Sequence, residues 1–205
     1  AIRARGTAAQ PFKAGPDLID PGYHTAAAGQ PCRNLDTMLL PGDRLLELFD
    51  RSAPEGGVSV IEGVMGLFDG AGARDERGST AHLAKTLASP VILTVNGKAM
   101  GRSAAALVAG FSGFDPETQV KGVIFNNISG ERHYLLLKEA VEDHTGIPVL
   151  GWLPTRDDIA LPERRMGLVP AAINPQARAL AETLGRMAEE SMDIGGVLSI
   201  ARSAP

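Results

Sequence analysis

Apolar and polar positions along the chain follow two periods, and these periods predict alternating strands and helices. Short apolar runs rich in β-branched residues, bounded by Gly or Pro, indicate buried strands. They occur at residues 7–12, 58–61, 91–95, 120–125 and 147–152. Apolar residues spaced three and four apart indicate helices. These cover residues 42–51, 80–88, 103–111, 131–144 and 175–190.

Strand and helix alternate with short connections, which predicts an α/β fold. We expect a doubly wound, mostly parallel sheet with helices on both faces, as in P-loop NTPases. The opening AIRARG resembles a helix end closed by Gly6, so we expect a strand and a helix before it. No G-x-x-x-x-G-K-[ST] phosphate loop occurs in the chain. Either this protein does not use such a loop, or the loop lies before Ala1, and the helical opening favours the second explanation. We therefore expect one α/β domain over residues 1–190 that lacks its first strand and phosphate loop, and a linker or tail over residues 191–205.

Composition narrows the classes of protein that are possible. The 205 residues are 44% hydrophobic with a net charge of −4, which is typical of a soluble globular protein and not of a nucleic-acid binder. No apolar run is long enough for a membrane span. The single cysteine, Cys32, excludes an internal disulfide framework and favours a reducing cytoplasm. Cys32 itself fits a small loop or core residue better than a nucleophile.

The stretch QPFKAGPDLIDPGYH predicts a ligand site. Lys13, Asp17 and Asp20 follow a short strand, at the sheet edge where α/β proteins bind ligands. Lysine suits phosphate oxygens, and carboxylates suit Mg²⁺. The alternative is a solvated turn, because Pro, Gly and Asp are common turn residues.

A second acidic segment, IEGVMGLFDG, follows the next strand. Glu62 ends an apolar run, glycines allow close backbone approach to a ligand, and Asp69 returns a second carboxylate. A carboxylate at a strand end can hold Mg²⁺ for a nucleotide. The alternative is a loop carboxylate that caps a helix. The carboxylates that follow these two parallel strands would meet at one edge of the sheet.

Three further segments hold candidate residues, and each segment also has a simpler structural interpretation. Ser79 or Thr80 could cap a helix, and that helix N-terminus could also bind an anion. Asn126 ends a strand and could read a base edge, or form an Asx turn. Arg164 and Arg165, in LPERRMGLVP, could pair with carboxylates or be solvated.

These motifs together resemble the cobyrinic and hydrogenobyrinic acid a,c-diamide synthase family. The resemblance runs in order from Ala1 to about Leu184. It is carried by QPFKAGPDLIDPGYH, CRNLD, IEGVMGLFDG, GSTAHLAK, SAAALVAGF, GERHY and LPERRMGLVPA.

The resemblance implies an ATP-dependent amidoligase of cobalamin biosynthesis. In this family a synthetase domain related to dethiobiotin synthetase precedes a glutaminase domain, and Cys32 does not match the glutaminase cysteine. The resemblance implies ATP and Mg²⁺ as cofactors, a corrinoid polycarboxylate as substrate, and ammonia derived from glutamine. We expect the fragment alone to be inactive, and a homodimer is possible.

The resemblance also implies residue roles. Lys13 would contact phosphate, Glu62 with Asp17 would hold Mg²⁺, and Asn126 would face adenine. Asp17, Asp20 and Asp69 would order the metal, the nucleotide or the ammonia path. Ser79 and Thr80 would help to bind the nucleotide, and Arg164 and Arg165 would meet substrate carboxylates.

The chain departs from the family pattern at a few positions. Leu18 replaces an aromatic residue, Asn96 replaces an aspartate, Thr37 and Met38 stand where a tryptophan is common, and Arg165 replaces a histidine. Two alternatives therefore stay open. One is a non-catalytic nucleotide-binding or regulatory module of the same fold, and the other is a related ligase acting on another tetrapyrrole.

Overall fold

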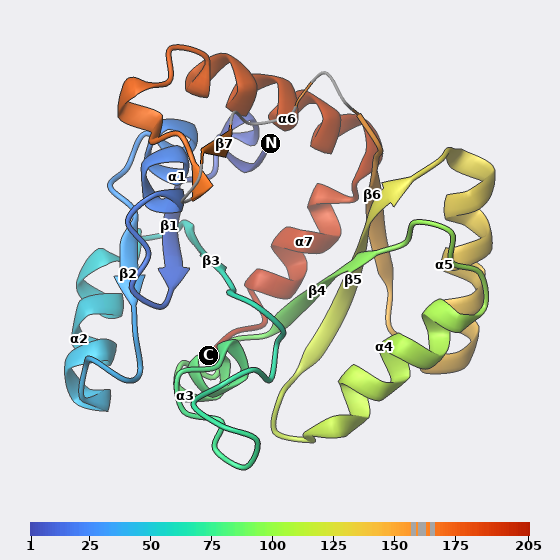
Figure 1. The fold of residues 1–205 in the computed structure, drawn as a ribbon, viewed down its shortest axis with the longest axis horizontal. Coiled ribbons are helices and arrows are strands. Elements are labelled where there is room, and N and C mark those ends of the chain that lie inside the picture. Colours follow the sequence, from blue (N-terminus) through green and yellow to red (C-terminus); the bar gives the residue numbers. More distant parts are fainter. Residues whose placement is uncertain (157–158, 160–162, 165–166) are drawn as a thin grey trace. The chain divides into compact units, whose positions relative to one another are not determined.

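The computed structural model describes residues 1–156, 159, 163–164 and 167–205 (Figure 1). The chain forms two compact units. The first unit contains Ala1–Ala88 and Leu161–Leu184, and the second contains Ser89–Ala160 and Gly185–Pro205. Helix α6 (Ala177–Ser191) begins in the first unit and ends in the second.

The first unit is built on a three-stranded parallel sheet in the order β2-β1-β3. Its strands are β1 (Ala9–Ala14), β2 (Arg33–Leu35) and β3 (Val58–Glu62). Its helices are α1 (Asp20–Ala28), α2 (Gly42–Ser52) and α3 (Thr80–Thr86), with short 3₁₀ turns at Ile2–Arg5 and Ala171–Ile173. The two-residue strands β7 (Glu163–Arg164) and β8 (Gly167–Leu168) form an antiparallel pair.

Side-chain alternation along β1 separates the core from the site. Phe12 and Ala14 point to one face, where they pack with Leu45 of α2 and Leu83 of α3. Lys13 points to the opposite face, toward Asp20 at the start of α1. Helices therefore cover both faces of this sheet, and a buried lysine lies between the sheet and α1.

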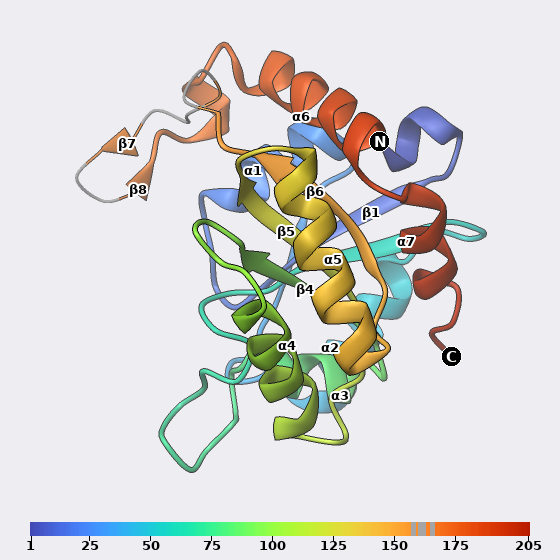
Figure 2. The same cartoon turned by 90° about the vertical axis from the view of Figure 1, so that its right-hand side faces the viewer.

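The second unit contains the parallel sheet β4-β5-β6. Its strands are β4 (Val91–Asn96), β5 (Val120–Ile128) and β6 (Val149–Pro154), and its helices are α4 (Ser103–Phe114), α5 (Glu131–Thr145) and α7 (Ile194–Ala201). A Cβ at Gly122 of β5 would lie 3.0 Å from the Ile200 side chain of α7. Phe125 is three residues after Gly122 in β5, so its side chain points to the opposite face of the sheet, the face on which α5 packs. Helices therefore pack on both faces of the second sheet (Figure 2).

The structure confirms the expected α/β class, with parallel strands and helices, but it distributes the strands over two sheets. Most element bounds lie within two or three residues of those expected. Residues 191–205 differ from the expected linker or tail, because Ile194–Ala201 form α7. Ile194 and Leu198 of this helix are buried, and the Asp193 side chain caps it. No helix among the described residues is long and apolar enough to cross a membrane.

Candidate functional site

The site lies at the carboxyl ends of the strands of the first unit. In the sheet register, Lys13 of β1 lies beside Asn34 of β2 on one side and Glu62 of β3 on the other. Neighbouring residues in parallel strands point to the same face, so these three side chains form a row across the sheet. Helix α1 covers this row and adds Asp20 and His24 to it.

Lys13 is the centre of the cluster and is 4% exposed. Its ammonium group lies 2.9 Å from the Asp20 carboxylate and 3.0 Å from Glu62 Oε2. It also donates to the Gly63 carbonyl at 3.4 Å. Burial lowers the pKa of Lys13, but hydrogen bonds to Asp20 and Glu62 outweigh burial and raise it above 10.5. The lysine therefore carries its charge at neutral pH.

Glu62 accepts two hydrogen bonds on the same oxygen, Oε2. One comes from Lys13, and the other joins Glu62 to His24 Nε2. Burial raises the pKa of Glu62, but the bonds from His24 and Lys13 outweigh burial and hold the pKa below 4.5. The Glu62 side chain is 46% exposed, so a ligand can reach it.

His24 is a site residue that we did not predict from the sequence. Pro21 and Gly22 made this stretch resemble a loop, whereas α1 begins at Asp20 with proline in its first turn. Asp20 and His24 are four residues apart and therefore share one helix face. Once the helix is recognised, that spacing is the signal that would have identified His24.

Asp17 organises the start of α1. Its carboxylate accepts hydrogen bonds from the Ile19 amide at 2.7 Å and the Asp20 amide at 3.0 Å. Burial raises the pKa of Asp17, but these two amides and then the charge of Lys13 bring it below 3.8. The Asp17 carbonyl accepts from Asn34 Nδ2 at 2.6 Å. Asn34 Oδ1 is buried and has no hydrogen-bond partner among the described residues.

Asp69 does not join the cluster through any contact between described residues. Its carboxylate instead accepts from the Gly66 amide at 2.8 Å, within its own loop. The Asp69 amide in turn donates to the Gly66 carbonyl at 3.0 Å, which closes a tight turn. Of the four residues expected to converge, Lys13 and Glu62 are therefore in contact and Asp17 lies close enough to feel the charge of Lys13, whereas Asp69 contacts its own loop. The roles of all four stay predictions.

Ser79 and Thr80 have structural contacts at the start of α3. Ser79 is the N-cap and accepts from the His82 amide at 3.0 Å, which agrees with the capping interpretation. Thr80 Oγ1 accepts from the Val64 amide at 3.0 Å and so ties α3 to the loop after β3. Their role in binding a nucleotide stays a prediction.

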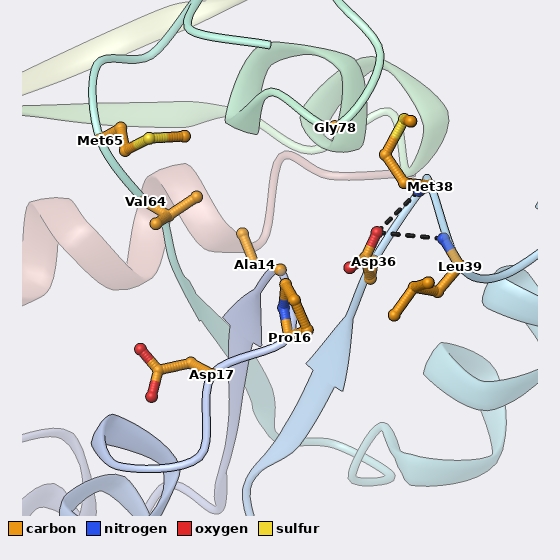
Figure 3. A pocket seen from close by; sticks show the side chains of 10 residues that line it. Ala14, Pro16, Asp17, Asp36, Met38, Leu39, Val64, Met65 and Gly78 are labelled. Carbon is orange, nitrogen blue, oxygen red and sulfur yellow. Dashed lines mark hydrogen bonds between the residues drawn. The ribbon is translucent and has the colours of Figure 1, made fainter. Parts of the chain in front are cut away.

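A cavity of about 480 Å³ opens at the same edge of the first sheet (Figure 3). Met38 and Leu39 lie on one side of it and Val64 and Met65 on the other. Asp36, at the end of β2, accepts from the Met38 and Leu39 amides at 2.7 and 3.2 Å. Met38, Leu39 and Met65 are more than half exposed, so the mouth of the cavity is apolar.

Asn126 lies in the second unit, near the end of β5. Its Oδ1 accepts from the Asn127 amide at 2.9 Å, and the Asn127 side chain donates to Asn96 Oδ1 at 3.2 Å. Asn127 has a φ of 59°, in the left-handed region that asparagine tolerates. An Asx turn would instead use the amide two residues on, so the structure does not show that turn at Asn126. The adenine role of Asn126 stays a prediction.

The structure gives less information on the two arginine candidates. Arg164 is in β7, whose backbone pairs with β8, and Arg165 lies outside the described residues.

The thiol of Cys32 is not activated. Burial, followed by the charge of Glu62, raises the pKa of Cys32 to about 11. A thiol with this pKa is almost wholly protonated at neutral pH and is a poor nucleophile.

The side chains near Glu62 offer few ligands for the expected Mg²⁺. No group of three or more His, Cys, Asp or Glu side chains in the described part of the chain could hold a metal. Mg²⁺ at nucleotide sites takes only one or two carboxylates and completes its shell with phosphate and water. Lys13 and His24 occupy Oε2 of Glu62, and the side chain is about half exposed. Oε1 could therefore serve as the single carboxylate ligand of such an Mg²⁺.

Comparisons with known proteins agree with the resemblance found in the sequence. The chain is 46% identical over 205 residues to a cobyrinate a,c-diamide synthase of Listeria innocua, which covers 100% of this chain and 45% of the relative. It is 45% identical over 203 residues to that of Salmonella typhimurium (97% and 43%), and 42% identical over 201 residues to that of Priestia megaterium (98% and 44%). The chain thus spans less than half the length of these curated relatives, and no solved structure matches it significantly.

A family model described as the CobQ/CobB/MinD/ParA nucleotide binding domain matches residues 1–169. This match includes the strand ends that carry Lys13 and Glu62, and it confirms the expected P-loop NTPase-like fold class. The chain belongs to the CobQ/CobB/MinD/ParA nucleotide-binding domain family.

Proposed function

We propose that this chain is the synthetase part of an ATP- and glutamine-dependent enzyme that amidates the a and c carboxylates of cobyrinic or hydrogenobyrinic acid. The relatives named above are cobyrinate a,c-diamide synthases. The structural observation that supports the proposal is the buried Lys13 between Asp20 and Glu62 at the carboxyl edge of the first sheet. Nucleotide and substrate sites occur at this edge in α/β proteins.

The first chemical step brings together two anions, the substrate carboxylate and ATP, and therefore needs a cation near both. A substrate carboxylate oxygen attacks the γ-phosphorus of ATP, and ADP leaves, which gives an acyl phosphate. Ammonia then attacks the acyl carbon, and inorganic phosphate and a proton leave as the amide forms. Both first-step reactants are negative, so Lys13, charged at neutral pH, lowers their repulsion in the transition state.

The other residues support this step. Glu62 would hold Mg²⁺, which neutralises charge developing on the phosphates. Asp20 holds Lys13, while Asp17 fixes the beginning of α1. Within the same proposal, the N-terminus of α3 at Ser79 and Thr80 assists the phosphates, and Asp69 orders the loop after β3. Asn126 faces adenine, and Arg164 and Arg165 meet carboxylates of the corrinoid.

The relatives extend well beyond this chain, and we propose that a part of the protein matching their additional length supplies the ammonia. A glutaminase domain there would release ammonia from glutamine, and the synthetase would consume it. The intact enzyme would act in the cytoplasm. Cys32, with a pKa of about 11, is unsuited to be the glutaminase nucleophile.

The test uses the full-length protein incubated with cobyrinic acid, Mg·ATP and glutamine. Chromatography with mass spectrometry should detect the diamide, and ADP release should accompany each amide formed. Glu62→Gln should lower the rate by about 100-fold or more, as expected when a group that stabilises transition-state charge is removed. Circular dichroism should show that its fold is unchanged.

Glu47→Gln is the matched control, because this carboxylate pairs only with the exposed Arg44 and Arg51 on α2 among the described residues. It should amidate at the wild-type rate. Nucleotide binding without amidation of any corrinoid would instead identify a non-catalytic module. Amidation of a different tetrapyrrole acid would identify a related ligase.

A further inference from the structure

The contact between His24 and Glu62 connects helix α1 to strand β3. Asp20 and His24 lie one helical turn apart on α1, while Lys13 and Glu62 lie side by side in the sheet. Asp20 contacts Lys13, Lys13 contacts Glu62, and Glu62 contacts His24. The four side chains thus form one continuous chain of alternating donors and acceptors.

Lys13 and His24 hold the same carboxylate oxygen from two directions. A single bond to Oε2 would leave the Glu62 carboxylate free to rotate about it, whereas two bonds from different elements define its orientation. The position of the other oxygen, Oε1, is thereby determined. The His24 side chain is 29% exposed and that of Glu62 46%, so the pair borders solvent where a ligand could enter.

We infer that His24 is a positioning residue that orients Glu62 for Mg²⁺ bound with the nucleotide. This inference rests on the proposed function, in which Glu62 is the metal carboxylate. Groups that hydrogen-bond a ligating carboxylate orient it and tune metal affinity. His24 Nε2 is engaged with Glu62, so this nitrogen acts on the carboxylate and not on the metal.

A purely structural role is the competing explanation, and the other contacts of α1 argue against it. Tyr23 donates to the Val169 carbonyl at 2.5 Å, and Thr25 Oγ1 accepts from the Cys32 amide at 2.9 Å. Asp20 holds Lys13 at the start of the helix. Helix α1 therefore keeps several attachments to the first unit when His24 is replaced.

The experiment measures Mg²⁺ binding to the full-length protein by calorimetry in the presence of a non-hydrolysable ATP analogue. His24→Ala should weaken Mg²⁺ binding by about 10- to 100-fold, the usual effect of losing a partner of a metal ligand. His24→Gln retains an N–H donor of similar reach and should recover most of the affinity. In the amidation assay, His24→Ala should raise the Mg²⁺ concentration needed for half-maximal rate, with the KM for the corrinoid unchanged.

Tyr23→Phe is the matched control on the same helix, since it removes an anchor of α1 without touching Glu62. Its Mg²⁺ affinity should equal that of the wild type. Wild-type affinity in His24→Ala, or an equal loss in Tyr23→Phe, would overturn the positioning role alone. A wild-type protein that binds no Mg²⁺ with the nucleotide analogue would refute both the proposed function and this inference.

Discussion

At the scale of single residues, the site depends on one buried ammonium group and the carboxylates around it. Lys13 is almost fully buried, and a buried charge is tolerated only when it is paired. Asp20 and Glu62 supply that pairing, and both their side chains remain partly exposed. The cluster therefore satisfies the buried lysine and still presents carboxylates to a ligand.

The lowered pKa of Glu62 makes stability depend on pH. The carboxylate is favoured in the folded state, so its contribution is complete above about 4.5 and disappears as pH falls through the lower folded pKa. We expect Glu62→Gln to be less stable than the wild type at pH 7, with a gap that closes at acidic pH. Denaturant unfolding at a series of pH values measures it.

Glu47→Gln again provides the comparison for this prediction. Exposed ion pairs contribute little to stability, so its gap from the wild type should be small at every pH. A Glu62→Gln gap that stays constant from pH 7 to pH 3 would contradict the assigned role of the carboxylate charge.

At the scale of elements, the periodicity of the sequence predicted strands and helices well wherever the apolar pattern was regular. Strands β3 to β6 and helices α2 to α5 lie near their expected positions. Several short or irregular elements were not predicted, for local reasons. For example, β2 has only three residues, α1 begins with Asp-Pro-Gly, and α7 lies in the segment expected to be a linker or tail. In each of them the local signal was weak, and tertiary contacts stabilise the element.

At this scale we predict that replacing Gly151 in β6 by alanine lowers stability. Its φ is 144°, and a Cβ there would lie 2.4 Å from the Ser191 carbonyl oxygen. Gly151→Ala should therefore lower the free energy of unfolding by about 1–3 kcal/mol through backbone strain and the clash. Gly110 in α4 has open space around it, so Gly110→Ala should raise stability by about 0.5–1 kcal/mol.

Chemical denaturation of the two glycine variants checks this pair. Opposite signs are the expected result. A neutral Gly151→Ala would mean that β6 and the Ser191–Met192 segment can separate at little cost, against the close contact seen in the structure.

At the scale of the whole molecule, each compact unit has its own apolar core. Phe12 is fully buried in the first unit, and Val123 is fully buried in the second. Strand β1 lies at the centre of the first sheet and β5 at the centre of the second. Each core therefore supports its own three strands, which suggests that the two units lose structure with separate free energies.

Substitutions in the two cores should affect different amides. Phe12→Ala should cost about 3–5 kcal/mol and should reduce hydrogen-exchange protection most in β1, β2 and β3. Val123→Ala is the reciprocal variant and should reduce protection most in β4, β5 and β6. Equal loss of protection in all six strands for either variant would show that the units unfold together.

The candidate site illustrates which information is local and which is not. The chain pattern was sufficient to place Lys13 and Glu62 at neighbouring strand ends, because apolar runs that end in a charged residue are visible in sequence and parallel strands bring such ends together. It was not sufficient for Asp69 or His24. A carboxylate that folds back on its own Gly66 cannot be told from sequence apart from one that joins its neighbours.

The local periodicity of the sequence encodes the positions of most strands and the α/β class. It also places Lys13 and Glu62 at the ends of their strands, so these features follow from the order of residues alone. The register that sets Asn34, Lys13 and Glu62 in one row, the division of the strands between two sheets, and the contact of His24 with Glu62 required the folded chain. These features join residues that are tens of positions apart, and such pairings depend on packing and hydrogen bonding across the whole unit rather than on any short stretch of sequence.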